Sequence, residues 1–86
     1  MLIARDPDVR LKKLDGEAVL FHLETGDYFS LNATGLFVWE ACGSPVRFEQ
    51  LCQEFAREFK LGEPVASRDL KAFIGLMERQ QLLKVS

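Results

Sequence analysis

Side chains that could perform nucleophilic or metal chemistry are few in this chain of 86 residues, which has one histidine and two cysteines. Nucleophilic catalysis needs a nucleophile, a base within reach and a group that orients the base. His22 lies in a segment with strand character, while Cys42 and Cys52 lie on two apolar helical stripes without zinc-ligand spacing. We therefore expect no catalytic residue, no metal and no cofactor, and we interpret both cysteines as buried thiols in a reducing compartment.

Composition and charge indicate one globular domain that spans residues 1–86. Hydrophobic residues make up 48% and charged residues 28% of the chain, which is ordinary for a folded protein. No apolar run approaches the roughly 20 residues of a membrane helix, and no signal peptide opens the chain. The net charge is −2, and the basic residues are scattered, whereas DNA binders usually carry a basic stripe. We expect a cytoplasmic protein with neither a membrane nor a nucleic-acid partner.

The first third of the sequence predicts a meander of three strands, at residues 9–14, 17–23 and 28–31. Between the first two stands Asp15-Gly16, a dipeptide suited to a two-residue hairpin turn with positive φ at both positions. This turn pairs Leu14 with Glu17. A second loop, of four residues at 24–27, would pair Leu23 with Tyr28 and so place Leu20 opposite Leu31.

These registers divide the sheet into two faces. The face with the stronger core character carries Val9, Leu11, Ala18, Leu20, His22, Phe29 and Leu31. The opposite face carries Arg10, Lys12, Val19, Phe21, Leu23, Tyr28 and Ser30, which is less polar than an ordinary solvent-facing surface. We expect this second face to cover something, such as a partner or another copy of the chain.

Three helices are predicted after the strands, at about residues 33–42, 48–59 and 65–81. Asn32 is a favourable N-cap for the first helix, and Gly43 supplies its end. Apolar residues recur at helical spacing in the other two, at Phe48, Leu51, Cys52, Phe55 and Phe59, then at Leu70, Phe73, Ile74 and Met77. A three-stranded antiparallel sheet followed by three helices predicts an α+β fold that resembles a winged helix-turn-helix.

The third predicted strand lies at the border of its sheet, so its outer backbone groups are free unless another element covers them. An incoming peptide can pair with such a border as an added strand. The off-stripe side chains of the third helix could line the other wall, namely Arg68, Lys71, Ala72, Leu76 and Arg79. The alternatives are an ordinary solvated edge, pairing with a second copy in a homodimer, and a winged-helix DNA-binding regulator.

The junction from strand to helix carries a family resemblance. Residues 26–32 read Gly-Asp-Tyr-Phe-Ser-Leu-Asn, followed by Ala33-Thr34-Gly35 and Trp39. This junction resembles the PqqD-like family, small proteins of pyrroloquinoline quinone (PQQ) synthesis and of other peptide-modifying clusters. Residues 6–9, 18–20, 48–51 and 69–74 extend the resemblance over nearly the whole length. Residues 27–32 are also similar to the leader-binding proteins of lasso-peptide clusters, so the peptide product stays open.

The resemblance implies a recognition element for ribosomally made, post-translationally modified peptides. Such a domain binds the leader segment of a precursor peptide as an added strand and presents it to a modifying enzyme, often a radical-SAM enzyme. Carried onto this chain, the strand would be formed by Asp27, Tyr28, Phe29, Ser30 and Leu31. Two departures stand out: Arg47 replaces the expected Ser or Thr N-cap of the second helix, and His22 occupies a position where a small polar or acidic residue is expected.

Overall fold

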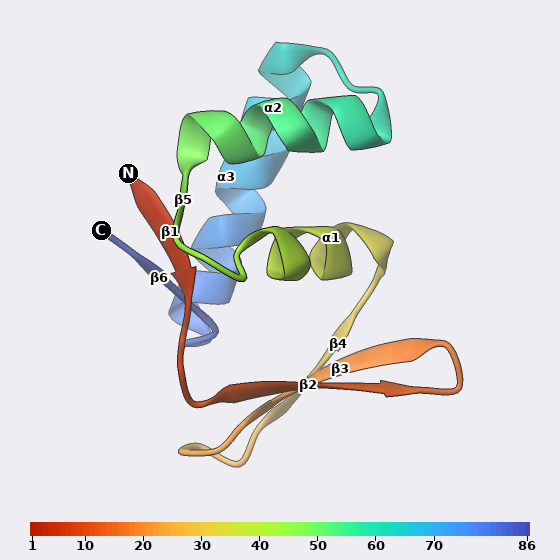
Figure 1. Cartoon of the computed structure of the whole chain (residues 1–86), viewed down its shortest axis with the longest axis vertical. Coiled ribbons are helices and arrows are strands. Elements are labelled where there is room, and N and C mark those ends of the chain that lie inside the picture. Colours follow the sequence, from red (N-terminus) through yellow and green to blue (C-terminus); the bar gives the residue numbers. More distant parts are fainter.

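Three helices and six short strands make up the computed structural model, which describes all residues from 1 to 86 (Figure 1). In chain order they are β1 (Leu2–Arg5), β2 (Val9–Leu14), β3 (Glu17–His22), β4 (Tyr28–Leu31), α1 (Ala33–Ala41), β5 (Val46–Arg47), α2 (Phe48–Phe59), α3 (Glu63–Arg79) and β6 (Leu83–Val85). The α+β class, the antiparallel meander and the three helices are confirmed. None of the helices is both long enough and apolar enough to cross a bilayer.

The predicted meander forms one sheet in the order β2-β3-β4. Leu14 pairs with Glu17 and Val9 with His22, as the two-residue turn predicted. Asp15 and Gly16 adopt φ values of 49° and 82°, the left-handed conformation that this type of turn requires.

The register between β3 and β4 differs from the prediction by two residues. Leu20 pairs with Phe29, not with Leu31. The loop comprises residues 23–26 instead of 24–27, because the His22 backbone N–H donates to the Asp27 carbonyl at 3.0 Å and the Gly26 N–H donates back to the His22 carbonyl at 2.8 Å. A shift of two residues leaves every side chain on its predicted face, since side chains alternate with a period of two.

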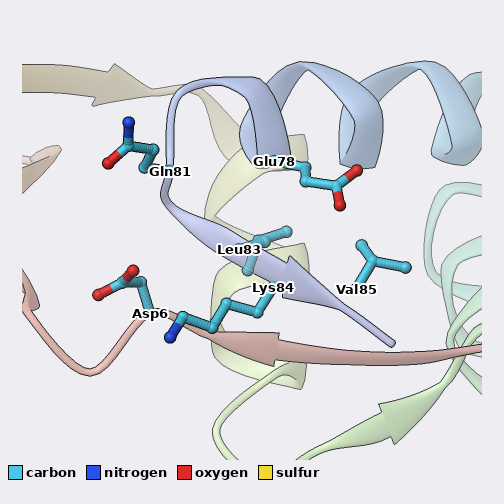
Figure 2. A pocket seen from close by; sticks show the side chains of 6 residues that line it. All are labelled: Asp6, Glu78, Gln81, Leu83, Lys84 and Val85. Carbon is cyan, nitrogen blue, oxygen red and sulfur yellow. The ribbon is translucent and has the colours of Figure 1, made fainter.

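A second sheet, in the order β5-β1-β6, was absent from the sequence prediction. It joins the two ends of the chain, because Leu2 and Ser86 exchange backbone hydrogen bonds of 2.8 and 3.0 Å. The close view in Figure 2 shows β6 between β1 and the last turn of α3. This sheet therefore anchors the C-terminal end of α3 to the start of the chain.

Each helix begins differently. The Asn32 side chain accepts a hydrogen bond from the Gly35 backbone N–H at 2.8 Å, which confirms the predicted cap of α1. Arg47 makes no such side-chain bond at the start of α2. There the Phe48 N–H donates to the carbonyl of Met1, the residue before β1, at 3.0 Å. Helix α3 begins at Glu63, two residues earlier than predicted, with a proline in its first turn, a position that suits proline.

The core lies where α1 meets the other elements. Its largest fully buried side chains are Trp39, Ile3, Leu20, Leu51, Leu70, Leu82 and Leu83. Trp39 is further held by Arg5, whose Nε donates to the Trp39 carbonyl at 2.8 Å while its guanidinium lies 4.7 Å from the centre of the indole ring. Together these contacts fix α1 between the two sheets, so the position of β4, which leads directly into α1, is set by the core.

Candidate peptide-binding site

Strand β4 is the outermost strand of its sheet, and one of its sides has no partner strand. In an antiparallel ladder, successive residues direct their backbone groups alternately to the two sides. Because Asp27 is bonded to His22, Phe29 and Leu31 also direct theirs toward β3. Tyr28 and Ser30 therefore direct their N–H and C=O groups to the open side, where they can hydrogen-bond with an added strand.

The side chains of β4 divide between two faces. Phe29 and Leu31 are half-buried and pack against the core. Tyr28 is 68% exposed on the opposite face, where its ring centre lies 4.8 Å from that of Phe21. Ser30 is exposed on the same face. A strand added to β4 would thus place alternate side chains toward the helices and toward Tyr28.

Helix α3 approaches the place where β4 ends. A Cβ atom on Gly35, in the first turn of α1, would lie 3.0 Å from Leu31 Cδ2 and 3.2 Å from Phe73 Cζ. Phe73 thus brings α3 against the β4–α1 junction. Leu76, one turn further along the same flank, is 47% exposed, and Ala72 beside it is exposed. This flank of α3 forms an apolar wall near the open strand.

The three basic residues predicted for the wall lie in different environments. Arg68 is exposed and pairs with Asp69, with 3.3 Å between Nε and Oδ1. Arg79 is exposed in the last turn of α3. Lys71 lies on another side of the helix, with its Nζ 5.7 Å from the ring centre of Phe48 in α2. The structure therefore brings Ala72, Leu76 and Phe73 to one flank but does not bring Lys71 to it, and α3 has no continuous basic stripe.

His22, the only histidine, is 1% exposed. Its Nδ1 accepts hydrogen bonds from the backbone N–H groups of Glu24 and Thr25 at 3.2 and 3.4 Å, so the ring proton resides on Nε2. Nε2 is buried without a hydrogen-bond partner, 3.9 Å from Asp6 Oδ2. These contacts explain the unexpected histidine: it orders the loop that leads into β4.

Both cysteines are free and buried. Burial raises the pKa of the Cys42 thiol from 9.0 to about 11, although the nearby charge of Arg5 opposes this shift. Burial, and secondarily the charge of Glu63, also raises the pKa of Cys52, against the effect of Lys71. Both thiols are therefore protonated at neutral pH and are poor nucleophiles. No group of three or more potential metal-binding side chains converges in the structure.

The surface has two hollows, and no residue of β4 lines either of them. One, of about 440 Å³, is formed by β6, Asp6 and the end of α3, with Glu78, Gln81 and Lys84 at its rim (Figure 2). The other, of about 470 Å³, includes Lys71, Phe48 and Cys52. Apart from Lys71, no residue that the sequence suggested for binding lines a hollow. The predicted site is thus a strand edge with a helical wall, not a pocket.

Comparisons with known proteins identify the family of this chain. Residues 17–83 match the family described as Coenzyme PQQ synthesis protein D (PqqD). This matched range includes the open strand β4 and all three helices. The chain belongs to the PqqD family. Comparison with curated proteins gives no significant sequence match.

Two solved structures share the fold of this PqqD-family chain. One is TbiB1 in complex with the TbiA(beta) leader peptide, at 30% identity, with 96% of each chain covered and a TM-score of 0.83. The other is a lasso peptide synthetase B1 complexed with the leader peptide, at 18% identity, with 96% and 98% covered and a TM-score of 0.82. The predicted family resemblance is therefore confirmed.

Two residues at this site were not among those that the sequence suggested for binding. Phe73 was predicted only as part of the buried stripe of α3, yet it is half-buried at the junction with β4. Gly35 belongs to the family motif, and its lack of a side chain lets Leu31 and Phe73 approach. The spacing of Phe73 and Leu76, three residues apart, was the available signal, because such residues share one helix flank.

Proposed function

We propose that this protein is a non-catalytic, cytoplasmic adaptor that binds the leader segment of a ribosomally synthesised precursor peptide. The adaptor presents the bound precursor to a modifying enzyme, such as a radical-SAM enzyme. Membership of the PqqD family supports this proposal, as do the two solved proteins of the same fold, each of which is in complex with a leader peptide.

The observation that carries the proposal is the open side of β4. On this side β4 has no neighbouring strand, so the two N–H and two C=O groups of Tyr28 and Ser30 are available to a peptide. A peptide strand added there can hydrogen-bond with all four groups. Backbone pairing supplies affinity that depends little on sequence. Selection then comes from side chains that face the wall of α3.

The proposed contact residues follow from this geometry. On the strand they are Asp27, Tyr28, Phe29, Ser30 and Leu31. On the helix, Ala72 and Leu76 receive apolar side chains of the leader. Arg68 and Arg79 flank them and favour acidic leader residues, which mainly increases the association rate and fixes the register. Because Lys71 lies beside Phe48, its role is confined to long-range attraction.

The test is a titration followed by backbone amide NMR. The probes are the TbiA(beta) leader and, where the gene of this protein neighbours a gene for a precursor peptide, the leader of that precursor. We expect the largest shifts at Tyr28 and Ser30, where new hydrogen bonds form, and smaller shifts along α3 at Ala72 and Leu76. Shifts confined to other elements would exclude this binding site.

Two variants sharpen the test. Ser30→Pro removes one outward N–H without removing a bond to β3, so binding should weaken strongly while the fold persists. Val85→Pro is the matched control, because it removes an N–H from the outer side of β6 in the other sheet. Equal loss of binding in both variants would contradict the assignment to β4.

A further inference from the structure

The structure points to a second occupant of the open strand. We infer that, without a peptide, two copies of this chain pair through β4 as antiparallel strands, and that a bound leader replaces the second copy. The protein would thus protect its own binding edge until the precursor arrives. This inference concerns the same site as the proposed function and rests on it for the exchange, but the pairing of copies can be tested with no peptide present.

Charge distinguishes the two borders of the β2-β3-β4 sheet. Exposed strand edges usually carry charged residues, which prevent pairing between copies. Strand β2 carries three such residues, Arg10, Lys12 and Lys13, all of them exposed. If two copies paired through β2 around Leu11, Arg10 would lie opposite Lys12 of the second copy, and like charges directly opposite are destabilising.

Strand β4 has no protection of this kind. Its sequence, Tyr-Phe-Ser-Leu, contains neither a charge nor a proline. Its outward backbone groups belong to Tyr28 and Ser30, so pairing centred on Phe29 would set Tyr28 opposite Ser30 of the second copy, and the reverse. This register uses all four outward groups of each copy. It also keeps the two Asp27 carboxylates apart, because Asp27 faces Leu31 of the second copy.

The border of the second sheet lacks this self-complementarity. Strand β6 directs the backbone of Leu83 and Val85 outward, so a symmetric pair would be centred on Lys84. Lys84 is exposed and would face Lys84 of the second copy. In addition, Leu83 is only 2% exposed, so its backbone is already covered. Among the strand borders compared, β4 alone accepts a second copy without opposing charges.

Pairing through β4 also covers part of the exposed face of the sheet. Phe21 and Tyr28 lie in one row across β3 and β4, on the face that no helix covers. In the paired form this row continues onto Ser30 and Val19 of the second copy, so each Tyr28 gains Ser30 as a cross-strand neighbour. Tyr28 is 68% exposed in the single chain, and this contact reduces its exposed surface.

Sedimentation equilibrium of the peptide-free protein tests the inference. We expect the average mass to rise with concentration from 9.8 kDa toward about twice that value. Ser30→Pro should stay monomeric at the highest concentration, whereas Val85→Pro should associate like the wild type. A wild type that remains monomeric up to its solubility limit, or a dimer unaffected by Ser30→Pro, would overturn the inference. Circular dichroism of each variant verifies that it is folded.

A second set of variants tests the register. With Tyr28→Lys alone, or Ser30→Lys alone, the introduced lysine faces an uncharged residue of the second copy. With both substitutions together, two pairs of lysines oppose each other. We expect each single variant to associate and the double variant to lose association, a pattern that requires Tyr28 opposite Ser30. Equal association of all three would refute this register.

The exchange is measured by adding the leader that binds in the NMR titration. We expect it to return the wild type to one protein chain per particle. A complex that contains two chains and the peptide would overturn the exchange. If no leader binds, the proposed function fails, while the sedimentation results still decide whether the copies pair.

Discussion

Gly35 offers the sharpest test of how α3 is held against β4. Gly35 lies in the first turn of α1, where its α-hydrogen faces Leu31 and Phe73. A methyl group there would lie 3.0 Å from Leu31 Cδ2, 3.2 Å from Phe73 Cζ and 3.4 Å from Asn32 Oδ1. Carbon atoms prefer separations of about 3.5–4.0 Å, so Gly35→Ala forces strand, helix or cap to move.

Two opposing effects set the expected magnitude. In a helix interior, alanine is favoured over glycine by about 1 kcal/mol, and by less in the first turn. Overpacking a well-packed site costs about 1–3 kcal/mol. We therefore expect Gly35→Ala to lower the free energy of unfolding by about 1 kcal/mol, although helix propensity alone predicts an increase.

Gly75→Ala is the matched comparison. Gly75 lies inside α3, and its added methyl group would meet only the flexible end of Arg79, at 3.6 Å. This variant should gain up to about 1 kcal/mol. The two variants should thus differ by roughly 2 kcal/mol, or about 10 °C in Tm for a domain of this size. Urea and thermal unfolding measure both. If Gly35→Ala were as stable as Gly75→Ala, the close approach of α3 to the β4–α1 junction would be refuted.

Three further predictions concern single side chains. Asn32→Ala should cost about 1 kcal/mol in urea unfolding because the Gly35 N–H loses its cap, whereas Asn32→Ser, which keeps a capping oxygen, should cost much less. Because the pKa of Cys42 is raised to about 11, the native thiol should resist iodoacetamide at pH 8, and rapid alkylation of the native protein would contradict this. The contribution of this buried thiol to the free energy of unfolding should be fully present below pH 9. It should fall by roughly 2–3 kcal/mol as the pH rises toward 11. Arg5→Lys should cost about 1–2 kcal/mol, since lysine keeps the charge but cannot reproduce the planar contact with Trp39; an unchanged urea midpoint would contradict it.

Local signals predicted the first sheet and the helices well. The Asp15-Gly16 turn fixed one register, because a two-residue hairpin allows a single pairing. The second loop could not be placed from its residues alone, since residues 23–26 and 24–27 are both four-residue loops containing Gly26. The choice depends on His22, whose ring accepts two backbone N–H groups from the loop, and this contact cannot be read from the sequence pattern.

The second sheet escaped prediction for a different reason. Its strands contain only two to four residues, too few for an alternating pattern to be recognised. Their pairing is also non-local, since β1 bonds to strands that begin at Val46 and at Leu83. Such pairs are stabilised by tertiary contacts that no local window contains.

The strand of the candidate site can be placed from the sequence more directly than its helical wall. The open border of β4 followed from strand order, whereas the wall required the rotation of α3 about its axis. Lys71 and Leu76 are five residues apart, which at about 100° per residue separates them by about 140° around the helix. Both lie off the buried stripe, but on opposite flanks of it. Only the contacts of Phe73 with the β4–α1 junction and of Lys71 with Phe48 identify the flank that faces the strand.

The second sheet holds α3, the helical wall of the proposed site, in a fixed position relative to β4. A peptide held between a strand and a helix gains affinity only if the two elements keep their separation without it, because ordering them on binding would consume binding free energy. Strand β6 follows α3 after three residues and pairs with β1, while Met1, the residue before β1, accepts a hydrogen bond from the first residue of α2. Arg5, at the end of β1, holds α1 through Trp39, and β4 runs straight into α1. One chain of contacts thus links the wall to the strand through the core, so the part of the fold that the sequence did not reveal is the part that sets the width of the proposed site.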